Sequence, residues 1–301
     1  MTAVSFLSPS EIVSRKEDVM RRNRGVLRAV VGATILSGSM IALAPLAQAT
    51  TIPVACGENA LVDAINLANS TVDSDTLTLA GGCTYTLTAP HGGLANGLPV
   101  ITTPIELLGP ATITRTALLP FRIAEVGPTG NLTLTTSVAF TNGSVAGNGG
   151  GILNRGAVTL TTSSLSGNYA TLAGGGLANA DTPSGTAPAA SFTRSNVLGN
   201  TALLQGGGIY NGLRGTLTTT GVSGTPMLIS GNSGAQGGGI AAVDSTATTI
   251  TQTAVTVNHA LLTAGGVYRA NGTMTTNNAP ITANTPNNCV GSTPAVPNCT
   301  G

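Results

Sequence analysis

Polar and apolar residues alternate in short runs through most of the chain. Asp75-Thr76-Leu77-Thr78-Leu79 and Thr84-Tyr85-Thr86-Leu87-Thr88 show the two-residue period of a strand with one buried face. Shorter strands, separated by Gly and Pro, are predicted at 105–108, 111–114 and 132–134. Residues 58–69 instead place apolar side chains at helical spacing. The pattern predicts an all-β fold with one short helix near its beginning.

A glycine-rich line recurs at nearly regular intervals. Gly149-Gly150-Gly151-Ile152 returns with starts at Gly174, Gly206 and Gly237, and weakly at Ala264, so the starts are 25, 32, 31 and 27 residues apart. A short period of this size indicates stacked units, each of which buries its apolar face against its neighbours. Each unit is predicted to contain three strand segments, of which the glycine line is the first. We therefore expect a parallel β-solenoid, and the resemblance given below makes it a right-handed parallel β-helix.

An asparagine closes each predicted coil, three residues after an apolar residue. Asparagine tolerates the left-handed conformation that a sharp corner needs, and stacked asparagine side chains can bond along a column. The pairs are Leu165/Asn168, Val197/Asn200, Ile229/Asn232, Val255/Asn258 and Ile281/Asn284.

The repeat resembles the Gly-Gly-x-Ile and Phe-x-x-Asn motifs of polymorphic outer-membrane proteins. It is more similar still to exported bacterial right-handed parallel β-helix repeat proteins, which have a pectin-lyase-like fold. Residues 56–88 resemble the beginning of that second group: a cysteine, a helix containing Asp63-Ala64-Ile65, then an Asp-Thr-hydrophobic strand. The resemblance covers 50–301, although Leu, Val or Ile stands where the motif has Phe. It implies this fold and an exported location, without an assigned chemistry.

Residues 1–49 have the pattern of an N-terminal extension followed by a secretory signal peptide. A basic segment from Arg21 to Arg28 precedes an uncharged run at 29–44 and the small-x-small sequence Ala47-Gln48-Ala49. Either Met1 or Met20 could be the start. We expect 50–301 to be a single secreted or cell-surface domain with no transmembrane span after cleavage.

The four cysteines form two local pairs, Cys56 with Cys83 and Cys289 with Cys299. Four cysteines allow three pairings, but cysteines at opposite ends of a solenoid lie too far apart to bond. We expect two local disulfides, because exported chains meet oxidising conditions. The helix at 58–69 and the tail at 285–301 would then cap the first and last coils. Free thiols and a lipid-modified Cys56 are the less favoured alternatives.

Charge is sparse after residue 49. That segment has no lysine, six arginines and eight acidic residues, a net charge of −2. A chain with so few charges does not have the excess of basic residues that binding to nucleic acid or an anionic membrane requires. No Cys or His spacing suggests a metal site, and the glycine runs lack the aspartate of calcium-binding repeats. We expect no cofactor and no nucleic-acid partner.

One charged residue follows the glycine line in each coil, with alternating sign: Arg155, Asp181, Arg214, Asp244 and Arg269. Asp181 and Asp244, two coils apart, would lie roughly 9.6 Å apart at strand spacing, near the carboxylate separation of inverting glycosidases. They are the candidate catalytic residues of an enzymatic alternative, a polysaccharide lyase or glycoside hydrolase. A ladder of ion pairs that fixes strand register is favoured instead, because Arg214 would keep both aspartates ionised.

The middle strand of each coil places hydroxyl residues on both sides of an inward apolar residue. Such Thr-x-Thr ladders resemble the binding faces of some β-solenoid ice-binding proteins, which makes ice binding a further alternative. Threonine is also simply a good strand former on a solvated face, and that explanation is favoured. The candidate binding residues are Thr133, Thr135, Thr159, Thr161, Thr216, Thr218, Thr249 and Thr251, and Ser191, Thr193, Thr273 and Thr275 extend the pattern.

The repeat, the export signal and the lack of a reactive cluster favour a non-enzymatic function. We expect an adhesin-like protein that binds an extracellular or cell-surface glycan, a surface or a partner protein through a lateral face. The insertion at 181–190, rich in Pro and Gly, is a candidate contact loop, because insertions in solenoids project on one side.

Overall fold

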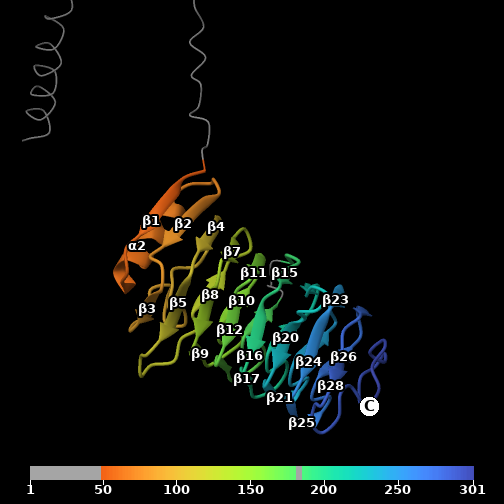
Figure 1. The fold of residues 1–301 in the computed structure, drawn as a ribbon. Helices are drawn as coiled ribbons and strands as arrows, with labels where there is room; N and C mark the ends of the chain where they lie inside the picture. The colour runs from red at the N-terminus through yellow and green to blue at the C-terminus, as the bar shows by residue number, and fades with distance from the viewer. Residues whose placement is uncertain (1–48, 181–184) are drawn as a thin grey trace, which may run out of the picture. The chain divides into compact units, whose positions relative to one another are not determined.

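The computed structural model of the chain describes residues 49–180 and 185–301, and these form a parallel β-solenoid (Figure 1). Each strand pairs in parallel with the strands one turn before and after it, except that the edge strands pair on one side only, and this builds four sheets. The predicted all-β fold with one short helix is confirmed. Residues 1–48 of the predicted leader, and the candidate Asp181, lie outside the described residues.

Two long sheets form much of the wall. The nine-stranded sheet contains β1 (Thr51–Val54), β2 (Asp75–Leu79), β4 (Pro104–Leu108), β7 (Asn131–Thr135), β11 (Ala157–Thr161), β15 (Ala189–Thr193), β19 (Thr216–Thr220), β23 (Ala247–Thr251) and β27 (Thr273–Asn277). The eight-stranded sheet contains β3 (Cys83–Leu87), β5 (Ala111–Arg115), β8 (Val138–Thr141), β12 (Ser164–Ser166), β16 (Asn196–Leu198), β20 (Met227–Ser230), β24 (Thr253–Thr256) and β28 (Ile281–Thr282).

Two shorter sheets complete the wall of the solenoid. The six-stranded sheet contains β6 (Ala124–Val126), β10 (Ile152–Asn154), β14 (Leu177–Asn179), β18 (Ile209–Asn211), β22 (Ile240–Val243) and β26 (Val267–Ala270). The five-stranded sheet contains β9 (Ser144–Val145), β13 (Tyr169–Ala170), β17 (Thr201–Ala202), β21 (Ser233–Gln236) and β25 (His259–Thr263). The prediction of three strands per coil is therefore wrong. Two-residue strands such as β13 are too short to show an alternating period.

Inward side chains stack in register to form the core. In the nine-stranded sheet Leu134 pairs with Leu160, and Leu160 with Phe192, and all three are fully buried. The column continues through Thr219, which is equally buried. The Thr219 hydroxyl accepts a hydrogen bond from Thr253 Oγ1 at 3.1 Å, so this polar group in the core is paired.

The predicted asparagine column is a continuous buried ladder. Asn168 Nδ2 donates to Asn200 Oδ1 at 2.9 Å, and Asn200 Nδ2 to Asn232 Oδ1 at 3.0 Å. The ladder continues through Asn258 and Asn284 at 2.9 and 3.0 Å. Each Oδ1 also accepts the backbone N–H of the preceding asparagine. The ladder therefore satisfies the corner backbone as well as the side chains.

Each glycine of the repeated run has its own structural reason, as 174–176 illustrate. Gly174 has a φ of +69°, a conformation that side chains disfavour. A Cβ on Gly175 would lie 2.4 Å from the carbonyl oxygen of Gly207, one turn away. A Cβ on Gly176 would lie 3.2 Å from the amide of Asn200 in the ladder. The glycines let neighbouring turns approach closely, and the strand that was predicted to include them begins only after them.

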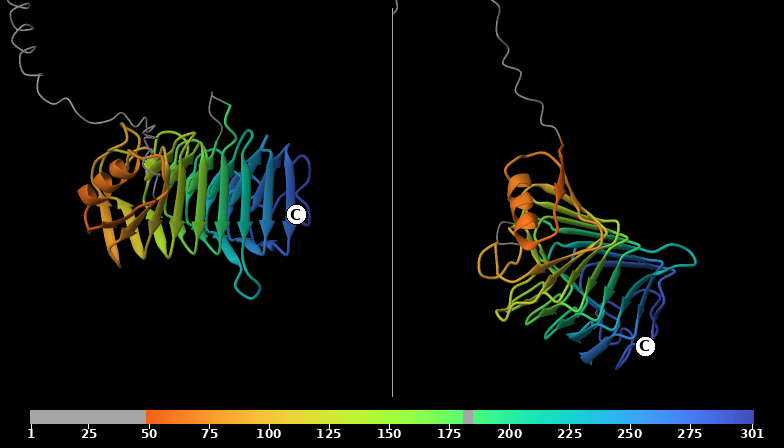
Figure 2. Two further views of the ribbon diagram at one scale, coloured as in Figure 1. Left: turned by 90° about the horizontal axis from the view of Figure 1, so that it is seen from above. Right: turned by 60° about the vertical axis from the view of Figure 1, so that its left-hand side comes forward.

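The helix and the first disulfide cover the N-terminal end of the solenoid (Figure 2). The helix α2 (Glu58–Ala68) ends one residue before the predicted boundary and packs its apolar stripe inward, with Leu61 and Ile65 fully buried. The predicted disulfide between Cys56 and Cys83 is confirmed, with 5.7 Å between the Cα atoms.

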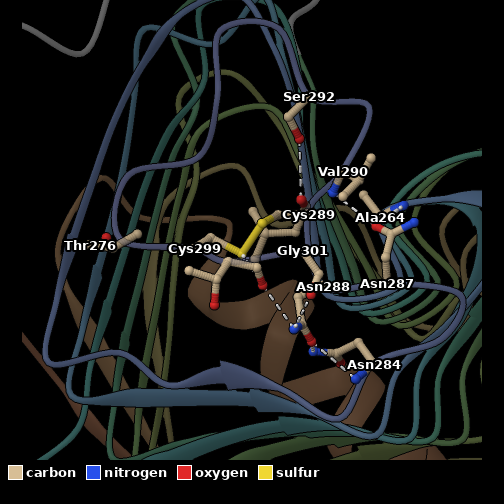
Figure 3. The surroundings of a disulfide bond; sticks show 12 residues. Ala264, Thr276, Asn284, Asn287, Asn288, Cys289, Val290, Ser292, Cys299 and Gly301 are labelled. Atoms are coloured by element: carbon tan, nitrogen blue, oxygen red, sulfur yellow. Dashed lines mark hydrogen bonds between the residues drawn. A yellow bond between two sulfur atoms is a disulfide. The ribbon is translucent and has the colours of Figure 1, made fainter.

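The C-terminal tail closes the other end. Residues 285–301 hydrogen-bond to the last coil, and the predicted disulfide between Cys289 and Cys299 is confirmed. Figure 3 shows Asn288 directly beyond Asn284. Asn288 Oδ1 accepts from Asn284 Nδ2 at 3.1 Å, while Asn288 Nδ2 donates to the carbonyls of Thr300 and Gly301. The tail thus terminates the ladder with its donors and acceptors paired.

Across residues 49–180 and 185–301, no helix combines the length and apolar character that crossing a membrane requires.

Candidate functional site

The outward side of the nine-stranded sheet presents two columns of side chains, all hydroxyl-bearing except Asn277, which we call the threonine face. The first column runs through the middle residue of each strand and the second through the residue two positions later. The strand pairing places Thr133, Thr159, Ser191, Thr218, Thr249 and Thr275 in the first column. It places Thr135, Thr161, Thr193, Thr220, Thr251 and Asn277 in the second.

The register corrects the predicted membership of this face. Thr216 pairs with Ala189 and Ala247 and so lies in a separate outward column. The partner of Phe192 is Thr219 rather than Leu217. The sequence pattern predicts Leu217 as the inward residue of β19 that lies beside Phe192. In the structure the hydrogen-bonded Thr219 takes that inward position, so the outward residues of β19 that belong to the face are two positions later than predicted. Thr273, which pairs with Ala247, lies in the same separate column as Thr216, and the remaining predicted threonines lie in the two columns of the face.

The threonine face is regular and carries no charge over six strands. Its side chains are half-buried to exposed, each offering a hydroxyl and, for threonine, a methyl group. Neighbouring strands lie about 4.8 Å apart and alternate residues about 6.7 Å apart along a strand. The carboxylate of Glu106 precedes Thr133 in the first column and accepts a hydrogen bond from Thr135 Oγ1 at 2.7 Å. The face can therefore make many weak contacts to a flat, neutral, repeating ligand.

An insertion marks the edge of the threonine face. The backbone N–H of Gly221 donates to Thr251 O at 3.0 Å, as Gln252 N–H donates to Asn277 O one turn later. Gln252 is followed directly by Thr253, the strand partner of Met227, whereas residues 222–226 separate Gly221 from Met227. These five extra residues form a small hairpin, closed by an antiparallel bridge between Val222 and Thr225, that projects from the solenoid (Figure 2, cyan).

The hairpin forms one wall of a surface pocket, which we call the corner pocket. Its volume is about 340 Å³, and its lining combines apolar rings with neutral polar groups and includes no charged residue: Val222, Ser223, Gly224, Pro226, Gln252, Asn278 and Pro280. Gln252 and Asn278 directly follow Thr251 and Asn277, so the pocket adjoins the second column of the threonine face. Sequence reasoning missed it, although the Gly-Val-Ser-Gly-Thr-Pro run between two strands was a visible sign of an insertion.

The predicted column of alternating charges is not formed between Asp244 and Arg269, and its member Asp181 lies outside the described residues. Counted from the equivalent first residues of β10, β18, β22 and β26, Arg155 is three residues on, Arg214 five, Asp244 four and Arg269 two. Asp244 Oδ1 accepts from Asn271 Nδ2 at 2.7 Å, and Arg269 Nη1 donates to the Ala295 carbonyl at 3.1 Å. The ladder therefore fails between these two residues, because variable loop lengths shift the charges out of register. Catalysis by Asp181 and Asp244 stays a prediction.

A buried charged cluster near the beginning of the solenoid was not predicted. Arg122 is 6% exposed, and its Nη1 lies 3.4 Å from Glu125 Oε2, while Glu125 Oε1 lies 3.5 Å from Arg155 Nε. Burial lowers the pKa of Arg122, Glu125 opposes that shift, and the charge of Arg155 adds to it. The Arg122 guanidinium also hydrogen-bonds Asn96 and the carbonyl of Asn148. These bonds tie three segments together, so the cluster is a structural element.

Within the described ranges, no group of three or more His, Cys, Asp or Glu side chains is placed to hold a metal ion. In comparisons with known proteins, no family model, curated protein or solved structure matches the chain significantly.

Proposed function

We propose that the protein is an exported, non-enzymatic binding protein whose threonine face binds a neutral, extended polysaccharide. The observation that supports this most is the uninterrupted register of one hydroxyl column over six strands and of a second over five, which ends in Asn277 on the sixth. Regular spacing suits a ligand that itself repeats. The absence of charge from these columns suits a neutral ligand, because an ionic ligand would lose its hydration without gaining a counter-charge.

The chemistry of threonine favours this ligand class. Each hydroxyl can donate to and accept from sugar hydroxyls, and each methyl offers apolar surface to the C–H faces of the sugar rings. A single such contact is weak, about 1 kcal/mol net. Six strands would add many contacts along one chain, so binding depends on ligand length.

The test is sedimentation of the mature protein with insoluble cellulose, chitin and a neutral β-glucan. We expect at least one of them to retain the protein, and the triple variant Thr159→Val, Thr218→Val and Thr249→Val to reduce the bound fraction by at least about fivefold, several lost hydrogen bonds being involved. Valine keeps the shape and strand preference of threonine. Thr86→Val, Thr141→Val and Thr256→Val, outward on the eight-stranded sheet, serve as the matched control. Retention by none of the three polysaccharides, or equal loss in both triple variants, would reject the proposal.

Ice binding is a second candidate, and one observation favours it. The two in-register columns form a grid of about 4.8 Å by 6.7 Å, and a regular grid of hydroxyl and methyl groups could order water on an ice plane. Thermal hysteresis of the purified protein would support this function. Its absence at millimolar protein concentration would eliminate it without affecting the polysaccharide proposal.

A polysaccharide lyase or glycoside hydrolase remains the enzymatic alternative. Depolymerisation of a polysaccharide by the mature protein, abolished by Asp181→Asn or Asp244→Asn, would replace the non-enzymatic proposal with this one.

A further inference from the structure

We propose that the corner pocket is a separate binding site for a neutral saccharide of one or two sugar units. The site is distinct from the threonine face in geometry, because it is a hollow bounded by the 222–226 hairpin rather than a flat strand surface. Its volume of about 340 Å³ lies at the lower end of the range for small-molecule pockets, which begins at about 300 Å³.

Three polar side chains of the pocket make no hydrogen bond to the described residues of the protein. The Ser223 hydroxyl and the side-chain amides of Gln252 and Asn278 line the pocket, and among the described residues none of the three side chains has a hydrogen-bond partner. Ser223 and Asn278 are exposed and Gln252 is half-buried, whereas the asparagines of the buried ladder are paired on both sides. Polar side chains without protein partners that line one hollow are available to a ligand.

The identity of these groups selects the ligand class. An amide presents one acceptor and two donors, and a hydroxyl both donates and accepts, which matches the adjacent hydroxyls of a sugar ring. The rings of Pro226 and Pro280 and the side chain of Val222 supply apolar surface for the C–H face of that ring. With no charged residue in the lining, a carboxylate, phosphate or ammonium group would be desolvated without a partner. The pocket therefore favours a neutral saccharide over an ionic ligand.

Two of these groups extend from backbone positions with the same conformation. Gln252 and Asn278 both adopt a φ of +47°, at equivalent corners of successive turns. Thr162 and Arg194 adopt a φ of +49° at the equivalent corners of earlier turns, so the positive φ is a property of this corner of the coil. Gly221 occupies the preceding corner, where a Cβ would lie 1.8 Å from the Gln252 carbonyl oxygen. The hairpin can leave the corner beside Gln252 only because residue 221 is glycine.

The experiment is a titration of the isotopically labelled mature protein with neutral sugars, observed through the side-chain amide signals of Gln252 and Asn278. The probes are glucose, galactose, mannose, N-acetylglucosamine and their common neutral disaccharides, with glucuronic acid as the charged comparison. We expect saturable shifts of both amide signals with at least one neutral sugar, and at least about tenfold weaker binding of glucuronic acid.

Three variants test the site itself. Deletion of 222–226 joins Gly221 directly to Met227, as Gln252 is joined to Thr253, and so removes the wall. Gly221 lacks the positive φ of Gln252 but, as glycine, can adopt it. Gln252→Asn and Asn278→Gly shorten or remove an amide while tolerating positive φ. Each should weaken binding about tenfold, the effect of losing one or two hydrogen bonds. Thr162→Gly, at the equivalent corner of an earlier turn, is the matched control.

The outcomes separate this site from the threonine face. The Thr159/Thr218/Thr249 valine variant should bind the small sugars as the native protein does, whatever the result with polysaccharides. No saturable shift with any neutral sugar would overturn the proposal, as would unchanged affinity in both the deletion variant and Gln252→Asn. Thermal unfolding of each variant identifies any that fail to fold, and the remaining variants then decide.

Discussion

Asn168 donates from Nδ2 to Oδ1 of Asn200 at 2.9 Å, across one turn of the solenoid, and both residues are buried. The same oxygen accepts the backbone N–H of Asn168 at 2.9 Å. The Asn200 oxygen therefore accepts two hydrogen bonds from the preceding turn. The Asn200 Nδ2 donates to Leu165 O in the preceding turn and to Asn232 Oδ1 in the following turn. This arrangement makes each turn depend on the next.

Replacing Asn200 with alanine should destabilise the solenoid strongly. The change leaves the buried N–H of Asn168 without its acceptor, and an unsatisfied buried group costs about 1–3 kcal/mol in addition to the lost packing. We expect a loss of at least about 2 kcal/mol in the free energy of unfolding, measured by denaturant titration. Asn277→Ala, an exposed change on β27, should stay within about 0.5 kcal/mol. Similar values for the two variants would show that the ladder is not a stabilising element.

Gly175→Ala should be destabilising although alanine is small. Its Cβ would lie 2.4 and 2.5 Å from the carbonyl oxygens of Gly207 and Thr201, which are backbone atoms and cannot move aside cheaply. We expect a cost of about 1–3 kcal/mol or more. Gly81→Ala is the matched control, since nothing lies within 4 Å of a Cβ there. Thermal unfolding of the two proteins compares them, and equal melting temperatures would contradict close packing of the turns.

Removing the C-terminal disulfide should open the last coil before the rest. Cys289 and Cys299 close a short loop whose tail hydrogen-bonds to Gly265 and Gly266 through the carbonyls of Asn287 and Asn288. The double change Cys289→Ser and Cys299→Ser should cost about 2–4 kcal/mol. Hydrogen exchange should accelerate in β27 and β28 while β11 and β12 stay protected. Uniform acceleration along the chain would instead mean that the solenoid unfolds as a single unit.

Acid should weaken the N-terminal cap. Burial raises the pKa of Glu58, but hydrogen bonds from Thr88, His91 and Ala89 outweigh it and lower the pKa overall. Burial likewise raises the pKa of Asp75, while bonds from Thr50 and Thr71 bring it below the usual value. A carboxyl whose pKa falls on folding contributes stability above its unfolded pKa, and this is lost as the pH drops through the folded value.

The acid effect should therefore appear below about pH 4, the ordinary range of Asp and Glu. Hydrogen exchange in α2 and β2 between pH 3 and 6 measures it, after correction for the intrinsic exchange rate. Glu58→Gln and Asp75→Asn should flatten the profile. Asp63→Asn is the control, because Asp63 makes no hydrogen bond or ion pair within the described residues. A profile that keeps its slope in both test variants would refute the assignment.

Much of the fold follows from the sequence because the repeat is local. The Asn168–Asn284 column and α2 are each set by short-range spacing, and the structure confirms both. The glycine runs also recur with local spacing, but the strands predicted to include them begin only after them. The pairing of the cysteines also followed, since a solenoid keeps its two ends apart. A second buried column, Asn154–Asn179–Asn211, was present in the sequence as an asparagine two residues after Ile or Leu, but was not recognised.

What the sequence by itself determined is the periodicity, and with it the parallel β-solenoid. What only the tertiary structure decided is which residues share a column. Thr216 and Thr220 are equally plausible members of the threonine face until pairing with β15 selects Thr220, because a core that accepts the hydroxyl of Thr219 permits either register. The corner pocket likewise exists only where the 222–226 hairpin meets Gln252 and Asn278 from two later turns. Such contacts depend on the stacking of turns, a relationship between residues about 30 positions apart that no local pattern specifies.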